Sequence, residues 1–324
     1  MEAWELFKKT VAGNKLIEPG AGVLAAVSGG PDSMCMLHML WRLKKTVPFD
    51  LYCVSIDHGL RNVAKKEVAA VSRWCQSHGI ASFVRRIPVA SYARENKLSV
   101  ETAGRMLRYE IFKSVAMETG CGSVATGHTA NDTAETALMW IIRGAGTEGL
   151  SGIPMARPLT GDINVIRPLH SITREEIMRY LRRQGMPYFT DVSNKAMDYT
   201  RNRIRSRLLP LLKTFNPRIV EHLYNLTQII SRENEYLQSV VSREISKSAH
   251  VGGSRITLAL KRFIGYNKVI QARILKNILP EKLSSSQIER LLDWVSLSDE
   301  RKMIFSRRWS INKNRHSLTF RKTK

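Results

Sequence analysis

A glycine-rich turn that follows an apolar run carries the residue types with the clearest chemical use. It reads Ser28-Gly29-Gly30-Pro31-Asp32-Ser33 and comes directly after the run at 23–27. Two glycines let the backbone approach a ligand closely, and a helix that begins here would direct free N–H groups at an anion. The turn therefore predicts a phosphate site, although it lacks the Gly-Lys-Ser/Thr ending of a Walker loop. A Gly-Gly turn with a purely structural role is the alternative.

A second polar group, Asp57 and His58, follows the apolar run at 51–56. If that run is a strand beside the first one, both side chains emerge close to the glycine turn and could face a nucleoside. An aspartate that only starts the next turn is the alternative.

A third group follows the run at 123–126 and contains His128, Asp132 and Glu135. The two acids are three residues apart, so one side of a helix would carry both carboxylates. Such a pair can hold Mg²⁺ or the ammonium group of an amine substrate, and His128 is placed to contact phosphate or to transfer a proton. Ordinary helix capping by Asn131 is the alternative.

Clustered arginines form the fourth candidate. Glu101, Arg105 and Arg108 have helical spacings of three and four, so they share one face of a predicted helix at 99–118. Guanidinium groups that point into a phosphate site would bind triphosphate or an RNA backbone. A solvated Glu–Arg pair is the alternative.

The elements that must position these residues alternate between strand and helix. Predicted strands lie at 23–27, 51–56, 83–89, 123–126 and 164–167, and predicted helices at 34–44, 65–78, 99–118, 132–143 and 173–184. This alternation is typical of an α/β protein with a doubly wound, mainly parallel sheet. Ligands of such sheets bind at the carboxyl ends of the strands, where Ser28, Asp57 and His128 fall. The glycine- and proline-rich stretch at 144–158 predicts a loop that forms a wall of the site.

The back third of the chain predicts a second, smaller domain. A boundary near 210–217 divides a nucleotide-binding domain, 1–212, from a basic, mainly helical domain, 213–324. Helices are predicted at 218–248, 267–278 and 286–295, and a hairpin at 303–320 with its turn at 312–314.

Charge points to a polyanionic partner. The chain of 324 residues has 51 Lys and Arg against 28 Asp and Glu, a formal net charge of +23. Residues 201–324 hold 26 basic and 9 acidic side chains, so most of the excess lies there, which favours RNA or DNA. The four scattered cysteines argue against zinc, iron–sulfur clusters and a disulfide framework. The sequence has no apolar run of membrane-spanning length and no signal peptide, so we expect a cytoplasmic protein without membrane contact.

Taken in order, these motifs resemble those of the tRNA(Ile)-lysidine synthases, a family of PP-loop ATP pyrophosphatases. The glycine turn resembles the Ser-Gly-Gly-x-Asp-Ser signature of that superfamily. The stretch at 143–152 resembles the family's Arg-Gly-Ser-Gly…Gly-Leu-x-Gly loop, and the stretch at 191–210 its Asp-x-Ser-Asn…Arg-Asn-x-Ile-Arg segment. The similarity spans about 24–210. The chain departs from the family at Asn131, where an acid is usual, and this puts in doubt any role that needs a second carboxylate there.

The resemblance implies a ligase for tRNA processing that joins free L-lysine to the first anticodon cytidine of a tRNA(Ile) with a CAU anticodon, with ATP and Mg²⁺. It implies catalytic roles for Asp32, Arg105, Arg108, His128 and Asp132. It implies ATP binding by Ser28, Gly29, Gly30, Pro31, Asp32, Ser33, Asp57 and His58, with Asp32 as the metal ligand. It implies substrate binding by Asp132, Glu135, Arg201, Arg203 and Arg205. The alternation of the last three does not keep one helical face, so we expect at least one to face solvent. A homodimer is compatible with the sequence.

Two other functions stay open. The first is another PP-loop enzyme, such as a tRNA thiolase, against which the missing Cys-x-x-Cys pairs and the Arg-Asn-x-Ile-Arg segment argue. The second is a noncatalytic RNA-binding protein with a decayed nucleotide fold, which the intact Ser28, Asp32 and Asp132 disfavour.

Overall fold

The computed structural model describes residues 2–57, 63–189, 200–252, 255–279, 281, 283–297, 301–306 and 309–322. The chain forms two compact units, residues 1–230 and 231–324. The division falls inside helix α11 (Ile219–Ser248). The predicted boundary after residue 212 lies within α10 (Leu209–Phe215), which belongs to the first unit.

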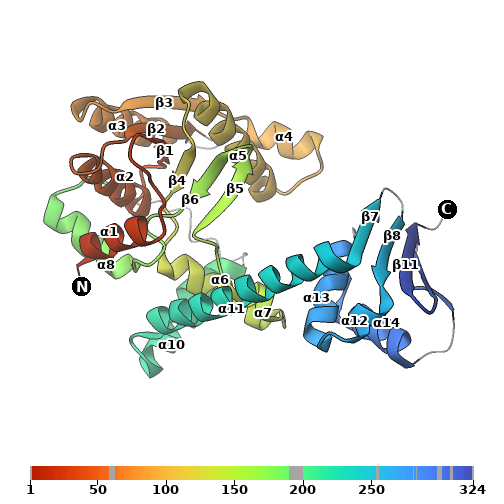
Figure 1. Cartoon of the computed structure of the whole chain (residues 1–324). Helices are drawn as coiled ribbons and strands as arrows, with labels where there is room; N and C mark the ends of the chain where they lie inside the picture. Colours follow the sequence, from red (N-terminus) through yellow and green to blue (C-terminus); the bar gives the residue numbers. More distant parts are fainter. Residues whose placement is uncertain are drawn as a thin grey trace. The chain divides into compact units, whose positions relative to one another are not determined.

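Six strands form the sheet of the N-terminal unit, in the order β3-β2-β1-β4-β6-β5 (Figure 1). They are β1 (Gly22–Ala26), β2 (Asp50–Asp57), β3 (Ala81–Arg86), β4 (Ser123–Thr126), β5 (Ala156–Thr160) and β6 (Ile163–Ile166). Neighbouring strands run parallel except β5, which is antiparallel to β6. The strand order reverses between β1 and β4, so the predicted doubly wound, mainly parallel sheet is confirmed.

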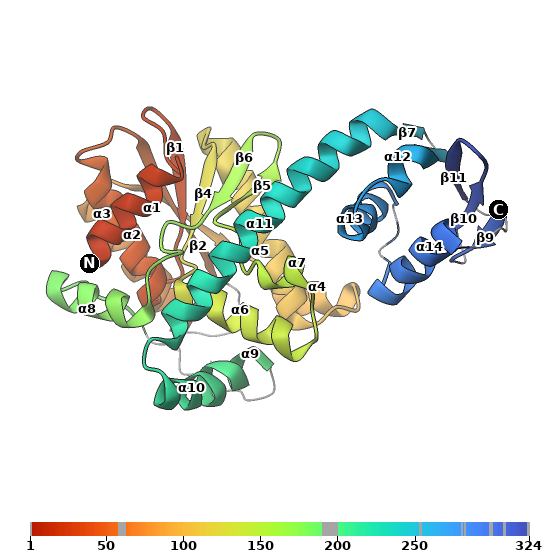
Figure 2. The ribbon, with the colours of Figure 1, turned by 60° about the horizontal axis from the view of Figure 1, so that its bottom comes forward.

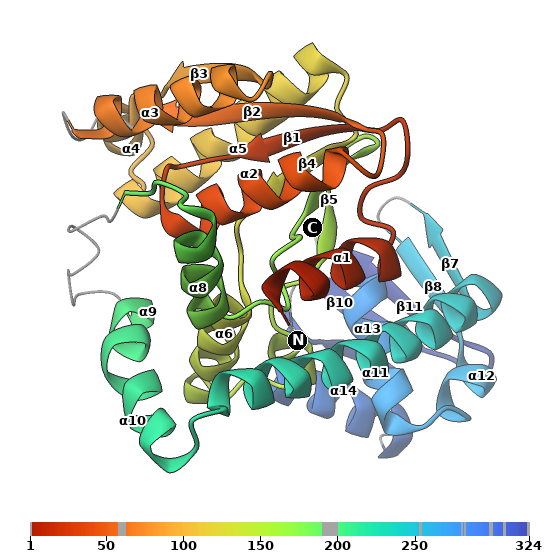
Figure 3. The ribbon, with the colours of Figure 1, turned by 90° about the vertical axis from the view of Figure 1, so that its left-hand side faces the viewer.

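Helices cover both faces of this sheet (Figure 3). One face carries α1 (Ala3–Gly13), α2 (Pro31–Lys44), α3 (Val63–Ser77) and α8 (Arg174–Gln184), and the other carries α4 (Val89–Glu95) and α5 (Val100–Thr119). Phe7, Leu40 and Leu181 are fully buried in the first layer, and Phe112 packs with Leu24 in the second. Because apolar side chains fill both faces, the central strands read as continuous apolar runs.

Several elements of the N-terminal unit differ from the sequence prediction. Residues 156–160 form the edge strand β5 instead of a loop, because Gly161, at a φ of +49°, permits the tight return into β6. Pro158 is tolerated because an edge strand needs hydrogen bonds on one side only. Strand β3 ends at Arg86 rather than at residue 89, and Val89 is instead the first residue of α4. Helix α1 was not predicted.

A helical layer built around α6 (Ala130–Ile142) completes the N-terminal unit (Figure 2). It contains α7 (Thr147–Leu150), α9 (Thr200–Arg203), the π-helix η2 (Ile204–Leu208) and α10. Leu138, Ile204 and Leu223 belong to the small core that joins this layer to the start of α11. The packing places α9 and η2 directly against α6.

The C-terminal unit combines helices with a five-stranded antiparallel sheet, in the order β7-β8-β11-β10-β9. The strands are β7 (Ala249–Gly252), β8 (Arg255–Ala259), β9 (Lys302–Ile304), β10 (Trp309–Lys313) and β11 (Ser317–Lys322), and the helices are α12 (Leu260–Ile264), α13 (Lys268–Ile278) and α14 (Ser285–Leu297). The predicted hairpin is present as β10 and β11, but its turn lies at 314–316. Strands β7 and β8 were missed. Among the residues that the structure describes, every helix is too short or too polar to span a lipid bilayer.

Candidate active site at the carboxyl edge of the sheet

The predicted phosphate turn joins β1 to α2 at the point where the strand order reverses. Gly29 has a φ of +83°, a left-handed conformation that favours glycine. The hydroxyl of Ser33 donates to the carbonyl oxygen of Gly30 at 3.0 Å and lies 3.2 Å from the Ser28 hydroxyl, so it closes the turn. Pro31 begins α2, where its missing N–H breaks no hydrogen bond. The first N–H groups of a helix lack partners within it, so this turn can bind an anion.

Gly127, between β4 and α6, lies against the start of α2. A Cβ atom at this position would come within 3.2 Å of backbone atoms of Asp32 and Ser33. Nine in ten real Cβ contacts are longer than such distances, so a side chain here would shift the phosphate turn. The two loops that follow β1 and β4 therefore meet at the carboxyl edge of the sheet, where ligands of such sheets bind, and we call this region the crevice.

The Asp32 carboxylate is held by an arginine from a distant helix. Arg174, the first residue of α8, donates from Nη2 and Nε to Asp32 Oδ2 at 2.9 and 3.3 Å. The other oxygen, Oδ1, is buried and accepts no hydrogen bond from the described residues. Burial raises the pKa of Asp32 above its ordinary value, although the charge of Arg174 acts in the opposite direction. The site thus contains one carboxylate oxygen that still lacks a partner.

Asp132 and Glu135, on the first turns of α6, are buried and paired with two arginines. Arg201 donates from Nε to Glu135 Oε2 at 2.8 Å and from Nη2 to Asp132 Oδ1 at 2.9 Å. Arg205 donates from Nε to Glu135 Oε1 at 2.5 Å and from Nη2 to Glu135 Oε2 at 2.8 Å. The arginine side chains stay 37% and 31% exposed, so the ion pairs lie at the edge of the crevice. We call these four residues the acid–arginine cluster.

Asp132 also takes part in the capping of its own helix, whereas Asn131, the alternative capping residue that the sequence offered, does not. Thr129 is the N-cap of α6, and its backbone N–H and hydroxyl both donate to Asp132 Oδ2, at 2.9 and 2.8 Å. Asn131 instead accepts the backbone N–H of Arg174 at 2.8 Å, at the start of α8. An amide oxygen can accept this hydrogen bond, so the contact does not require a carboxylate at this position. Burial alone would raise the pKa of Asp132, but Arg201, His128 and the Thr129 amide hold it below its ordinary value.

His128 lies beside the acid–arginine cluster. Its Nδ1 is 3.0 Å from the hydroxyl of Thr126, the last residue of β4. Burial lowers the pKa of His128 to about 4, and the positive charges of Arg167, Arg201 and Arg105 act in the same direction, against the opposing charge of Asp132. The imidazole is therefore neutral at pH 7.

The other predicted residues are distributed over this edge of the sheet. Asp57 ends β2 and is buried, with its Oδ2 4.0 Å from Nε of Arg86. Arg105 and Arg108 lie on the exposed side of the first half of α5. Arg203 is exposed, unlike Arg201 and Arg205, which are four residues apart and so share one helical face. His58 and residues 191–199 lie outside the described residues.

Sequence reasoning missed two arginines of the site, Arg174 and Arg167. Arg174 follows Thr173, which forms a capping box with Glu176 at the start of the helix predicted at 173–184, but such a box indicates only where a helix begins. Arg167 follows β6, beside the end of β4. A position directly after a parallel strand was the available signal, because such positions line the carboxyl edge.

The fold and the crevice define a nucleotide-binding α/β protein, and the chain belongs to the PP-loop family. The family model for the PP-loop domain matches residues 5–212. The chain is 34% identical over 302 residues to a tRNA(Ile)-lysidine synthase from Clostridioides difficile, covering 91% of this chain and 64% of that protein. It is 37% identical over 233 residues to a tRNA(Ile)-lysidine synthase from Thermosipho africanus, covering 70% of this chain and 53% of that protein. The chain thus spans less than two thirds of these relatives.

A solved structure supports the fold. The U34-tRNA thiolase NcsA from Methanococcus maripaludis, determined with its 4Fe–4S cluster, has a TM-score of 0.60 to this chain at 20% identity, over 72% of this chain and 79% of the thiolase. At that identity the similarity establishes the architecture alone.

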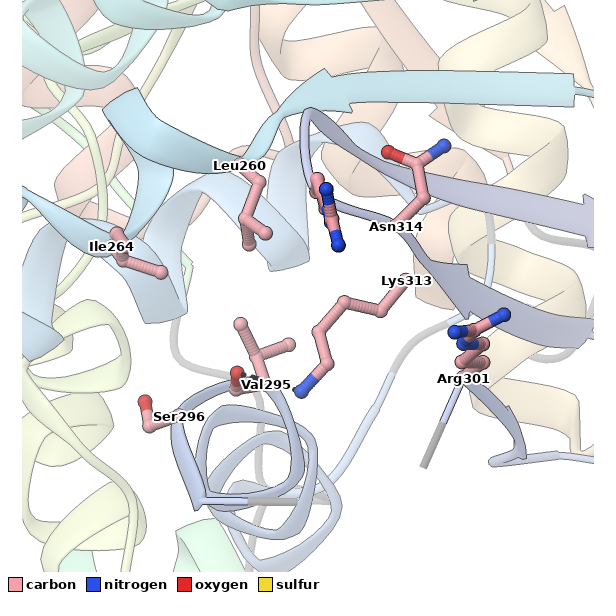
Figure 4. Close-up of a pocket in the computed structure, with 8 residues that line it drawn as sticks. Leu260, Ile264, Val295, Ser296, Arg301, Lys313 and Asn314 are labelled. Carbon is pink, nitrogen blue, oxygen red and sulfur yellow. Dashed lines mark hydrogen bonds between the residues drawn. The ribbon is translucent and has the colours of Figure 1, made fainter. Parts of the chain in front are cut away.

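The C-terminal unit contains a cavity of about 530 Å³ with a basic rim (Figure 4). Leu260, Ile264, Val295, Ser296, Arg301, Lys313, Asn314 and Arg315 line it. Lys313 Nζ lies 3.3 Å from the carbonyl oxygen of Val295 and 3.5 Å from that of Trp294, so it stabilises the C-terminal end of α14. Arg301 and Arg315 are exposed and can meet a polyanion.

Proposed function

We propose that this chain is an ATP-dependent ligase of the cytoplasm that joins free L-lysine to C2 of the first anticodon cytidine of tRNA(Ile) with a CAU anticodon. The product would read AUA rather than AUG and carry Ile rather than Met. One observation carries the proposal: Asp32 and the Asp132–Glu135 pair converge beside the phosphate turn of a chain that resembles tRNA(Ile)-lysidine synthases over most of its length.

The first step would activate the cytosine. Its O2 atom is a poor leaving group, so an amine cannot displace it directly. Attack of O2 on the α-phosphorus of ATP forms an adenylated cytidine and breaks the bond to the β-phosphate, which leaves with the γ-phosphate as pyrophosphate. The turn at 28–33 would hold the β- and γ-phosphates, Asp57 and His58 would face the adenosine, and Arg105 and Arg108 would offset the charge that develops at the α-phosphate.

Asp32 fits a Mg²⁺ ligand. Its Oδ1 is buried without a hydrogen bond from the described residues, and Mg²⁺ usually binds one or two carboxylates together with substrate phosphates. When bound, the ion supplies positive charge that neutralises the phosphate oxygens. Arg174 would keep Asp32 oriented through Oδ2.

The second step would attach lysine. Asp132 and Glu135 would bind the ε-ammonium group, which has the same charge as the guanidinium groups that now occupy them. Lysine would therefore displace one contact of Arg201 or Arg205, and the released arginine would contact the lysine carboxylate or the RNA. After loss of a proton to a carboxylate or water, the ε-nitrogen attacks C2 and AMP leaves. His128, neutral at pH 7, would act as a hydrogen-bonding partner.

Residues 213–324 are proposed to bind the tRNA body, with Arg203 as a further contact. The support is the charge excess of the back third and the basic rim of the cavity in the C-terminal unit. Recognition of a looped anticodon, whose bases are unstacked, is the usual mode for sequence-specific RNA binding.

The test is to incubate the chain with ATP, labelled L-lysine and tRNA(Ile) carrying a CAU anticodon. We expect label in the RNA and one AMP released for each lysine incorporated. Asp132→Asn and Asp32→Asn should each abolish incorporation, whereas Glu110→Gln, at an exposed position of α5, should not change it. RNA binding without incorporation would instead support the noncatalytic RNA-binding protein.

A further inference from the structure

Three arginines surround one tyrosine on the β5 side of the crevice. Arg157 of β5 and Arg105 of α5 place their Cζ atoms 4.6 and 5.2 Å from the ring centre of Tyr109. Arg167, directly after β6, is 3% exposed, and its charge interacts with the Tyr109 side chain. We call these four residues the Tyr109 cluster.

This cluster is electrically unbalanced. Among the described residues, no carboxylate lies within 4 Å of any of the three guanidinium groups. Arg167 donates from Nη1 to the carbonyl oxygen of Pro154 at 2.5 Å, but its buried Nε has no hydrogen-bond partner in the described structure. A buried cationic donor without a partner is costly, so the arrangement is built to receive an anion. Burial would raise the pKa of the Tyr109 phenol, but the arginines lower it overall, which reflects the same excess of positive charge.

The position of the cluster separates it from the phosphate turn. Arg167 follows Ile166, which is in register with Ala125 of β4, so it stands beside Thr126 and near His128. Strand β6 is two strands away from β1, which at about 4.8 Å per strand places it about 10 Å from the strand that feeds the phosphate turn. The cluster thus lies beyond His128, on the side of the crevice away from β2.

The surroundings of the Tyr109 ring indicate whether the cluster would bind a stacked base or a phosphate group. A tyrosine that stacks on RNA bases must present a free ring face, but cationic groups already lie against Tyr109 from two elements. Arginine forks match phosphate oxygens bidentately. The cluster therefore suits a phosphate group rather than a stacked base.

We infer that Arg157 and Arg167 of the Tyr109 cluster bind a backbone phosphate adjacent to the nucleotide that enters the crevice, whereas Arg105 faces the α-phosphate of ATP. This inference rests on the proposed RNA substrate. The phosphate turn at the start of α2 would bind the triphosphate of ATP. A second cationic site about 10 Å away therefore suits a phosphate of the RNA backbone.

The test measures RNA affinity without turnover. The probes are a short stem-loop RNA with a CAU loop and the same RNA with neutral methylphosphonates on both sides of the loop cytidine. Arg157→Gln should weaken binding of the first RNA about tenfold and lower the slope of log affinity against log salt by about 0.7 to 1. Arg157→Lys should restore most of the slope. Arg73→Gln, an exposed arginine of α3, is the matched control and should change affinity less than twofold.

Wild type and Arg157→Gln should bind the methylphosphonate RNA equally, because the contact is then absent from both. An undiminished Arg157→Gln effect on that RNA would overturn the inference. So would a loss of ATP affinity with unchanged RNA affinity, which would assign the cluster to the triphosphate. Failure of the proposed reaction looks different: lysine would not enter the RNA, while the Arg157-dependent affinity would persist.

Discussion

Glu135→Gln is the sharpest perturbation of the acid–arginine cluster. The side chain is 1% exposed and accepts three charge-assisted hydrogen bonds, one from Arg201 and two from Arg205. Removing one partner of a fully buried ion pair costs about 3–5 kcal/mol. Here both arginines are about a third exposed and keep Asp132 as a partner, so we expect a loss of about 2 kcal/mol in the free energy of unfolding.

Urea unfolding of the full chain measures this loss, with Glu110→Gln as an exposed control expected to change stability by less than about 0.5 kcal/mol. A double-mutant cycle with Arg205→Gln should give a coupling energy of about 1 kcal/mol or more. If Glu135→Gln were as stable as the control, or the coupling were zero, the arginines would not neutralise the acids in the free protein. The lysine site would then need no displacement of an arginine.

Three further predictions concern Gly127 and Asp32 of the crevice and His170, which is buried beside Thr133 of α6. Gly127→Ala should lower the free energy of unfolding by about 1 kcal/mol or more and raise the half-saturating ATP concentration, because the new Cβ meets the backbone at Asp32. Gly122→Ala, whose Cβ would have no neighbouring atom within 4 Å, should change neither quantity. Burial lowers the pKa of His170 to about 4, below the 6.5 of an unfolded chain. Between these two values the native state binds fewer protons than the unfolded state, so the free energy of unfolding decreases as the pH is lowered. In urea titrations, the wild type should lose about 2 kcal/mol more than His170→Gln between pH 7 and pH 5. Asp32→Asn should reduce lysine incorporation at least about 100-fold without lowering the melting temperature. Burial raises the pKa of Asp32, so the fold disfavours the ionised carboxylate, and its contribution to stability decreases as the pH rises through that pKa. A lower melting temperature would contradict this reasoning.

The sequence alone determined the local parts of this protein. The turn at 28–33 and the cap at Thr173 depend on neighbouring residues, so residue type and spacing are enough to predict them. The alternation of apolar runs with helical periods predicted the parallel sheet, because each crossover helix must bury its own apolar face on the strands. From that sheet, the convergence of Asp32, Asp57 and Asp132 at one edge follows.

Only the tertiary structure decided which charges meet. Arg174 is 142 residues from Asp32, and Arg201 is 66 residues from Glu135. Such pairs depend on how α8 and α9 pack against α2 and α6, and no local pattern encodes that packing. The edge strand β5 was not predicted for the same reason. Pro158 and the nearby glycines are typical of a loop, and only the pairing with β6 supplies the hydrogen bonds that make this segment a strand. A sequence fixes the chemistry that each side chain offers, whereas its partner, and hence its charge state, depends on long-range packing.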